Sequence, residues 1–154
     1  MRSIAAPGLV GVYLGIVLGL LACQPKPVAP GPFEGSYDYT AYDADGRAVL
    51  VGSFDLRASP GNPAGLVGAW DFRTIDPEPG IPPVNAAALG PHLGAGQLEA
   101  SPRGAALAIV LQPNSLDNQV ILTGTKRNGI FVGQWQHFAF GSVRAEGTFT
   151  AVVR

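Results

Sequence analysis

The sequence predicts an all-β fold, in which eight antiparallel strands in meander order close into a small barrel. Three observations predict it: short runs of alternating apolar and polar residues, turn-forming pairs between these runs, and a recurring pattern of glycine and aromatic residues. The chain has 21 glycines and 14 prolines in 154 residues, yet 47% of its residues are hydrophobic. Frequent turns combined with enough apolar residues for a core are typical of an all-β domain.

Apolar and polar residues alternate along eight stretches, which indicates half-buried antiparallel strands. The pairs Asp45-Gly46 and Asn128-Gly129 are preferred in two-residue hairpins, and 101–104 and 113–118 are also rich in turn residues. Short connections favour a meander, and closure into a barrel removes exposed strand edges. A two-sheet β-sandwich is the alternative. The predicted strands are 35–42, 47–58, 65–75, 94–101, 104–112, 118–126, 129–140 and 143–153.

Glycine precedes an aromatic residue by two positions in five of these strands. Residues two apart lie on the same face of a strand, so each glycine permits a sharp bend and leaves room for a large ring. The five pairs are Gly35 with Tyr37, Gly52 with Phe54, Gly68 with Trp70, Gly133 with Trp135, and Gly147 with Phe149. The side chains expected to point inward are Tyr37, Tyr39, Leu50, Phe54, Leu56, Leu66, Trp70, Phe72, Leu98, Leu107, Ile109, Leu111, Val120, Leu122, Phe131, Trp135, Phe149 and Val153.

The connection 76–93 is long, rich in proline and partly apolar. Loops of this length are uncommon without a function. It could be a packed loop that plugs one barrel end, a flap over a cavity, or a disordered segment. Residues 85–89 are the only stretch that we expect to form a helical turn within the domain.

No residue pattern in the chain indicates catalysis, so we expect a protein that is not an enzyme and has no cofactor. The two histidines, His92 and His137, are far apart in sequence, and no Gly-x-Ser-x-Gly motif is present. His137 shares a strand face with Trp135, which favours a structural position at a barrel end. The segment 43–46 resembles the start of a calcium loop but lacks the later acidic ligand, so we expect a hairpin turn and no metal site. With a formal net charge of −1, the chain offers no basic stripe for nucleic acid.

An apolar run from Leu9 to Ala22 directly precedes Cys23, the only cysteine in the chain. The run is shorter than the roughly 20 residues of a membrane-spanning helix but suits the apolar part of a signal peptide. Its last residues and the cysteine, Leu20-Leu21-Ala22-Cys23, resemble the lipobox of bacterial lipoproteins. The resemblance implies that a helical signal peptide is removed before Cys23, whose sulfur carries a diacylglycerol group. An uncleaved anchor and a buried hydrophobic helix are the alternatives.

This interpretation divides the chain into a lipoprotein signal peptide (1–22), a lipidated cysteine with a proline-rich tether (23–33), and a β-barrel domain (34–154). The membrane, bound through acylated Cys23, is then the first partner. Gln24, in place of the aspartate that retains enteric lipoproteins on the inner membrane, points to the outer membrane. We therefore expect a lipid-anchored protein of the bacterial cell envelope.

The Gly-x-Trp pattern at Trp70 and Trp135, together with the eight strands, resembles the calycin superfamily of avidins and lipocalins. Members typically have Gly-x-Trp near the first strand, where this chain has Tyr37 instead. The resemblance implies a ligand cup, with Tyr37, Trp70 and Trp135 as the expected ligand-binding residues at its mouth. The first predicted function is therefore binding of a small apolar ligand. The alternative is a solid barrel that serves as a protein-interaction or inhibitor module in the envelope.

Overall fold

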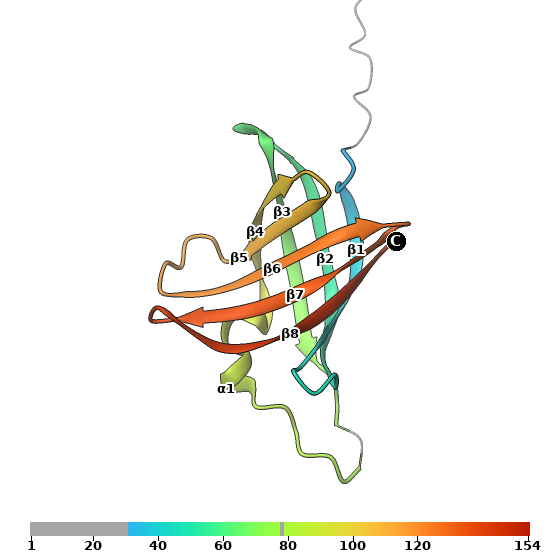
Figure 1. Ribbon diagram of the computed structural model, residues 1–154. Helices are drawn as coiled ribbons and strands as arrows, with labels where there is room; N and C mark the ends of the chain where they lie inside the picture. Colours follow the sequence, from blue (N-terminus) through green and yellow to red (C-terminus); the bar gives the residue numbers. More distant parts are fainter. Residues whose placement is uncertain (1–30, 78) are drawn as a thin grey trace, which may run out of the picture.

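The computed structural model describes residues 31–77 and 79–154, and it confirms the predicted fold as an eight-stranded antiparallel barrel (Figure 1). Each strand pairs with its sequence neighbours, and β1 pairs with β8, so the barrel has no free strand edge. The sandwich alternative is therefore wrong. The strands are β1 (Gly35–Tyr42), β2 (Ala48–Ser59), β3 (Asn62–Thr74), β4 (Gly94–Arg103), β5 (Ala106–Leu111), β6 (Asn118–Arg127), β7 (Ile130–Ala139) and β8 (Ser142–Val153).

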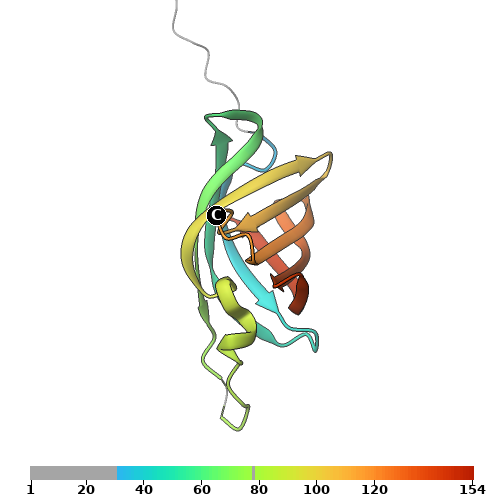
Figure 2. The ribbon, with the colours of Figure 1, turned by 90° about the vertical axis from the view of Figure 1, so that its left-hand side faces the viewer.

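The meander gives the barrel two distinct ends, which we name the tether end and the plug end (Figures 1 and 2). The tether end holds Phe33, the last residue Arg154, and the β2–β3, β4–β5 and β6–β7 turns. The plug end holds the β1–β2, β5–β6 and β7–β8 turns and the long β3–β4 connection. All eight strands and the whole core lie between Phe33 and Val153, so this part of the chain closes its own barrel.

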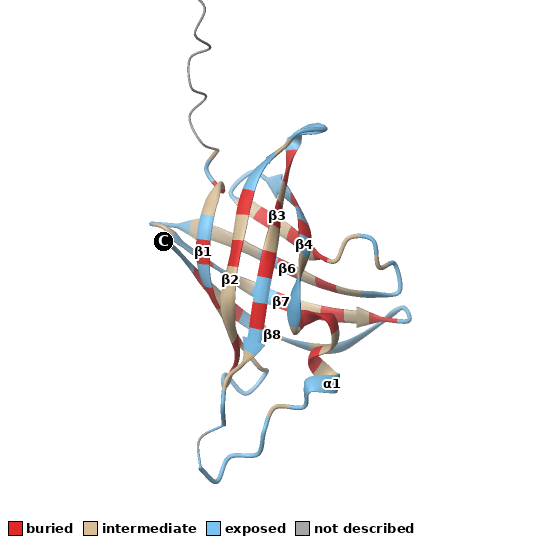
Figure 3. Ribbon diagram, turned by 180° about the vertical axis from the view of Figure 1, so that it is seen from behind, coloured by how far each residue is buried: buried red, intermediate tan, exposed pale blue. Residues whose placement is uncertain are grey.

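The expected inward-pointing residues form the core, and buried positions alternate with intermediate or exposed ones along the strands (Figure 3). Val153 is the exception: it lies at the rim, where the last strand ends, and is 37% exposed. Phe33, which precedes the expected start of the domain, is buried and packs into the core. The core thus includes one residue of the segment that the sequence assigned to the tether.

Four of the five glycines in the Gly-x-aromatic pattern lie where neighbouring strands approach closely. A Cβ atom on Gly52, Gly68, Gly133 or Gly147 would lie 2.0 Å or less from a backbone oxygen of the adjacent strand. Only glycine fits such a contact, so these positions let the strands bend around the small barrel. Gly35 is different, because a Cβ there would meet nothing within 4 Å.

Strand ends differ from the expected ones by a few residues, most clearly at the β4–β5 turn. The turn was expected at 101–104, but β4 continues to Arg103, and the turn begins at Gly104 with φ of 64°. Pro102 is tolerated inside β4 because the pairing of β4 with β3 ends at Ala100. Its missing N–H group therefore removes no bond to β3.

A short plug closes one end of the barrel. Helix α1 (Ala86–Leu89) is capped at its N-terminus by Asn85, whose side chain accepts a hydrogen bond from the Ala87 N–H at 3.1 Å. The 3₁₀ helix η1 (Gly90–His92) follows, and Leu89, Pro91 and His92 are buried. The expected helical turn is confirmed, and this part of the connection adopts the plug arrangement.

The predictions for the signal-peptide helix 1–22, for Cys23 and for the tether as far as residue 30 lie outside the described residues. Within the described ranges, no helix has the length and apolar character needed to cross a membrane.

Two hairpin turns have the same backbone geometry but different residues at the first position. Asn128-Gly129 joins β6 to β7 with φ values of 51° and 79°, and Phe140-Gly141 joins β7 to β8 with φ values of 50° and 75°. Positive φ at both positions defines a type I′ turn, in which asparagine and glycine are preferred. Phenylalanine in this region is strained by about 1–2 kcal/mol. Phe140 is also 79% exposed, so packing does not offset the strain.

Replacing this residue by the one in the matched turn, Phe140→Asn, should raise the free energy of unfolding by about 1 kcal/mol, because the strain is relieved. Urea denaturation followed by tryptophan fluorescence measures the change. The reciprocal control, Asn128→Phe, should lower the free energy by a similar amount. A Phe140→Asn protein less stable than the wild type would contradict the strain at this turn.

Candidate functional site

The inside of the barrel holds a continuous series of aromatic side chains. Tyr37 stacks on Phe54 with ring centroids 4.8 Å apart, and Tyr39 stacks on Phe72 at 4.2 Å. Phe72 also contacts Trp70, whose ring centroid is 5.1 Å away. Offset-stacked and edge-to-face ring pairs add stabilisation of about 0.5–1.5 kcal/mol beyond their buried area. The series therefore contributes to a rigid interior.

The three expected ligand-binding residues are all buried members of this series. Tyr37 lies toward the tether end, where its hydroxyl donates to the Phe33 carbonyl at 2.6 Å. Trp135 lies toward the plug end, where its Nε1 donates to the Tyr42 carbonyl at 2.8 Å. Trp70 lies across the strand pair from Phe54. Trp70 and Trp135 are linked through the rings of Phe72 and His92, while Tyr37 lies nearer the tether end. The role of these three residues in ligand binding stays a prediction.

His92 is the residue of the plug that enters the aromatic interior. It is fully buried, and its ring lies 4.8 Å from that of Trp135 and 5.7 Å from that of Phe72. Its Nε2 lies 2.8 Å from the hydroxyl of Tyr39. Burial, and secondarily the neighbouring His137, lowers the pKa of His92 to about 3, while burial raises the pKa of Tyr39 well above 10. The pair is therefore neutral at physiological pH.

His137 fastens the plug to the barrel wall. Its Nδ1 lies 3.0 Å from the carbonyl oxygen of Ala88 in α1, and its Nε2 lies 2.7 Å from Oδ1 of Asn118 on β6. Gly90 packs against the same ring, since a Cβ there would lie 2.3 Å from the imidazole. The expected position of His137 at a barrel end is confirmed, and its side chain joins three elements.

Among the described residues, two buried side-chain nitrogens have no hydrogen-bond partner: Nε1 of Trp70 and Nδ1 of His92. A buried polar atom that makes no hydrogen bond lowers the free energy of unfolding by about 1–3 kcal/mol. Both belong to the aromatic series, and Gly96 on β4 leaves the space beside the Trp70 indole open, since a Cβ there would meet its Nε1 at 3.2 Å. These atoms are the unsatisfied polar groups of the described interior.

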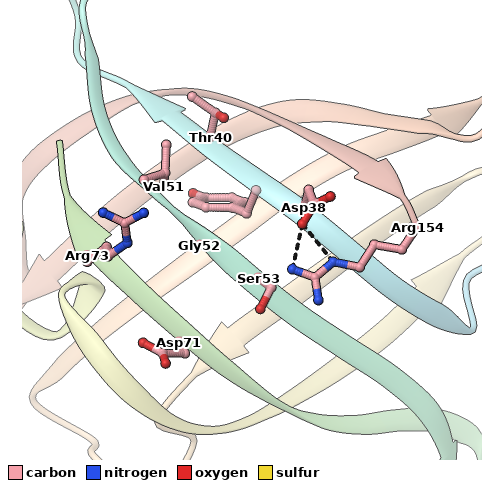
Figure 4. A pocket seen from close by; sticks show the side chains of 9 residues that line it. Asp38, Thr40, Val51, Gly52, Ser53, Asp71, Arg73 and Arg154 are labelled. Carbon is pink, nitrogen blue, oxygen red and sulfur yellow. Dashed lines mark hydrogen bonds and ion pairs between the residues drawn. The ribbon is translucent and has the colours of Figure 1, made fainter.

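A hollow of about 470 Å³ lies on the outer wall across β1, β2 and β3 (Figure 4). On one side Asp38 forms an ion pair with Arg154, and on the other side Asp71 and Arg73 project from β3 (Figure 4). Val51 lies between them on β2. The hollow is open to solvent and carries charges of both signs, so it suits a polar rather than an apolar ligand.

The described residues contain no group of three or more histidine, cysteine, aspartate or glutamate side chains placed to hold a metal ion. The segment 43–46 forms the expected hairpin turn, in which Oδ1 of Asp43 accepts from the backbone N–H groups of Asp45 and Arg47. Asp43 is thus engaged in the turn itself.

Neither the protein-family models nor the curated proteins contain a match to this chain. The fold and interior therefore define the class, a small closed eight-stranded β-barrel with an aromatic core and one plugged end. Sequence reasoning missed the buried role of His92. The apolar residues around it, Val84, Leu89 and Leu93, were the available signal, since they pack against the core.

Proposed function

We propose that this chain is an acyl-anchored lipoprotein of the bacterial envelope, whose barrel is solid and which acts by binding other proteins through its outer surface. The lipobox-like Leu20-Leu21-Ala22-Cys23 supports the anchor and the envelope location, with the outer membrane as the membrane concerned. The barrel supports the binding role, because its described residues form outer surfaces on which another protein can dock and are not arranged as a group of catalytic side chains.

The aromatic interior is the observation that carries the solid-barrel proposal. Barrels of eight strands are just wide enough for side chains to fill or for one small ligand to enter. Here the largest fully buried side chains are aromatic: Trp135, Tyr37, Tyr39, Phe72, Phe131 and Phe149. Phe33 covers the tether end, and the plug with His92 covers the other end. A ligand would have to displace these groups.

Binding of a small ligand remains the second candidate, and the unpartnered nitrogens of Trp70 and His92 favour it. A small molecule with a hydrogen-bond acceptor could satisfy the Trp70 indole if the plug moved away. The likeness to calycin-type barrels supports the same idea at the level of the fold. A plug held by His137 and Gly90 opposes it, because opening would break the contacts to α1.

The anchor makes a direct prediction for the full-length chain expressed in a bacterium with a lipoprotein pathway. Intact mass spectrometry of the membrane fraction should give residues 23–154 plus a diacylglycerol group and one acyl chain, because two or more chains are needed for a stable anchor. The Cys23→Ser variant should carry no lipid. Recovery of the wild type with an unmodified Cys23 would contradict the anchor.

A further inference from the structure

Two exposed apolar side chains lie together on neighbouring turns at the plug end. Leu116, in the β5–β6 turn, is 88% exposed, and Phe140, in the β7–β8 turn, is 79% exposed. The turns are joined by a hydrogen bond from the Phe140 N–H to the Asp117 carbonyl at 3.1 Å. We name this pair, with the half-exposed Val143 beside it, the tip. Isolated exposed apolar residues are common, but two on adjoining turns form one protruding apolar surface.

The positive φ of Phe140 indicates that its exposed ring has a function. The matched turn at the tether end has asparagine at the same position, with nearly the same φ. A bulky residue with positive φ is strained, and such strain is found where a function requires it. The fold alone would be satisfied by asparagine, so the geometry points to a contact made by the Phe140 side chain.

A second apolar surface lies on the outer wall near the tether end. Ile130 on β7 is directly opposite Val152 on β8, and Val132 follows on the same face of β7. All three are more than two fifths exposed. Thr125 and Thr150, the cross-strand neighbours of Val132, extend this neutral, β-branched surface. We name Ile130, Val132 and Val152 the wall.

The two surfaces carry opposite charges at their borders. Arg127 lies opposite Ile130, and Arg154 lies beyond the end of β8, where it pairs with Asp38. Asp117 follows Leu116 in the tip, and Glu146 lies further along β8. Arg144 also lies there, and its Nε donates to the Ala139 carbonyl. Arg127 together with the Arg154–Asp38 pair leaves the wall border net positive, and Asp117 and Glu146 outweigh Arg144 at the tip border. These opposite net charges favour contact between the tip and the wall.

We propose that the tip of one copy of this chain docks on the wall of a second copy, head to tail. The contact is heterologous, since two different surfaces of the same chain meet, so a pair of copies keeps one free tip and one free wall. The inference rests on the proposed function as an interaction module and names its partner. It requires neither the lipid anchor nor a ligand in the barrel.

Sedimentation velocity of residues 24–154 tests the proposal, because this part contains the complete barrel; a cooperative thermal transition verifies its folding first. The wild type should shift from monomer to larger species over roughly 10–500 µM, where small interfaces associate. Phe140→Asn in the tip and Val132→Glu in the wall should each weaken association at least tenfold. The matched control Val67→Glu, on β3, which lies opposite β7 in the closed barrel, and across from Arg57, should associate like the wild type.

Mixing the two defective variants gives the decisive result. Phe140→Asn keeps an intact wall, and Val132→Glu keeps an intact tip, so an equimolar mixture should form dimers and nothing larger. A wild type that stays monomeric would overturn the proposal, as would association that both variants leave unchanged. Loss of association in each variant without recovery in the mixture would also overturn it, by showing a symmetric contact. An unlipidated Cys23 in the full-length protein would refute the anchor and leave this result intact.

Discussion

Acidification from pH 7 to pH 4 should lower the free energy of unfolding by about 3 kcal/mol through His92 alone. The pKa of this imidazole is about 3 in the folded protein, against an ordinary value of 6.5. Between these two values the unfolded chain binds a proton that the folded barrel does not. The contribution of neutral His92 to the free energy of unfolding is therefore fully present above pH 6.5 and is lost as the pH decreases toward 3.

Urea denaturation at pH 7, 5.5 and 4 measures this loss, and the His92→Gln variant is the control because it cannot take up the proton. The groups that face His92 are Tyr39 from β1 and His137 from β7, with Phe72 and Trp135 as its apolar neighbours. Carboxylates elsewhere titrate in both proteins, so the difference between the two proteins isolates His92. Equal losses in both would show that His92 is not buried in neutral form.

The Gly52→Ala substitution should destabilise the barrel by about 3 kcal/mol or more, because it forces two bonded strands apart. The added Cβ would lie 2.0 Å from the carbonyl oxygen of Asp71 and 2.9 Å from the Cα of Phe72. Both atoms belong to the backbone of β3, which cannot move without breaking its pairing with β2. Chemical denaturation gives the size of the loss.

Gly61→Ala provides the matched control for this substitution. Gly61 lies in the β2–β3 turn of the same hairpin, and a Cβ there would meet nothing within 4 Å. Its effect should stay within about 0.5 kcal/mol, as is usual for surface positions. If the two variants proved equally stable, the close approach of β2 and β3 at Gly52 would be refuted.

Much of the barrel was predictable because its signals are local. A period of two assigns each side chain to the inside or the outside, and turn pairs such as Asn128-Gly129 fix the pairing of neighbouring strands. Closure then follows from the need to remove free edges. Val153 was misplaced because the period assigns it to the inside, while only the three-dimensional structure shows where the rim begins.

The plug and the surfaces could not be predicted in the same way. No period in the connection 76–93 marks His92 as a core residue, since its burial comes from contacts with distant strands. Phe140 was expected inside the strand 129–140, because phenylalanine-glycine is not a favoured turn pair. The tip and the wall each combine residues from different strands or turns, so their charges and apolar side chains meet only in the folded barrel.

Native mass spectrometry tests the solid barrel most directly. Residues 24–154, secreted by a bacterial host and purified under native conditions, should have the bare polypeptide mass. Their tryptophan fluorescence should not respond to a panel of lipids and small apolar molecules, because Trp70 and Trp135 are enclosed by protein side chains. A reproducible additional mass that is lost on denaturation, together with a fluorescence change, would contradict the solid barrel and establish a ligand inside it.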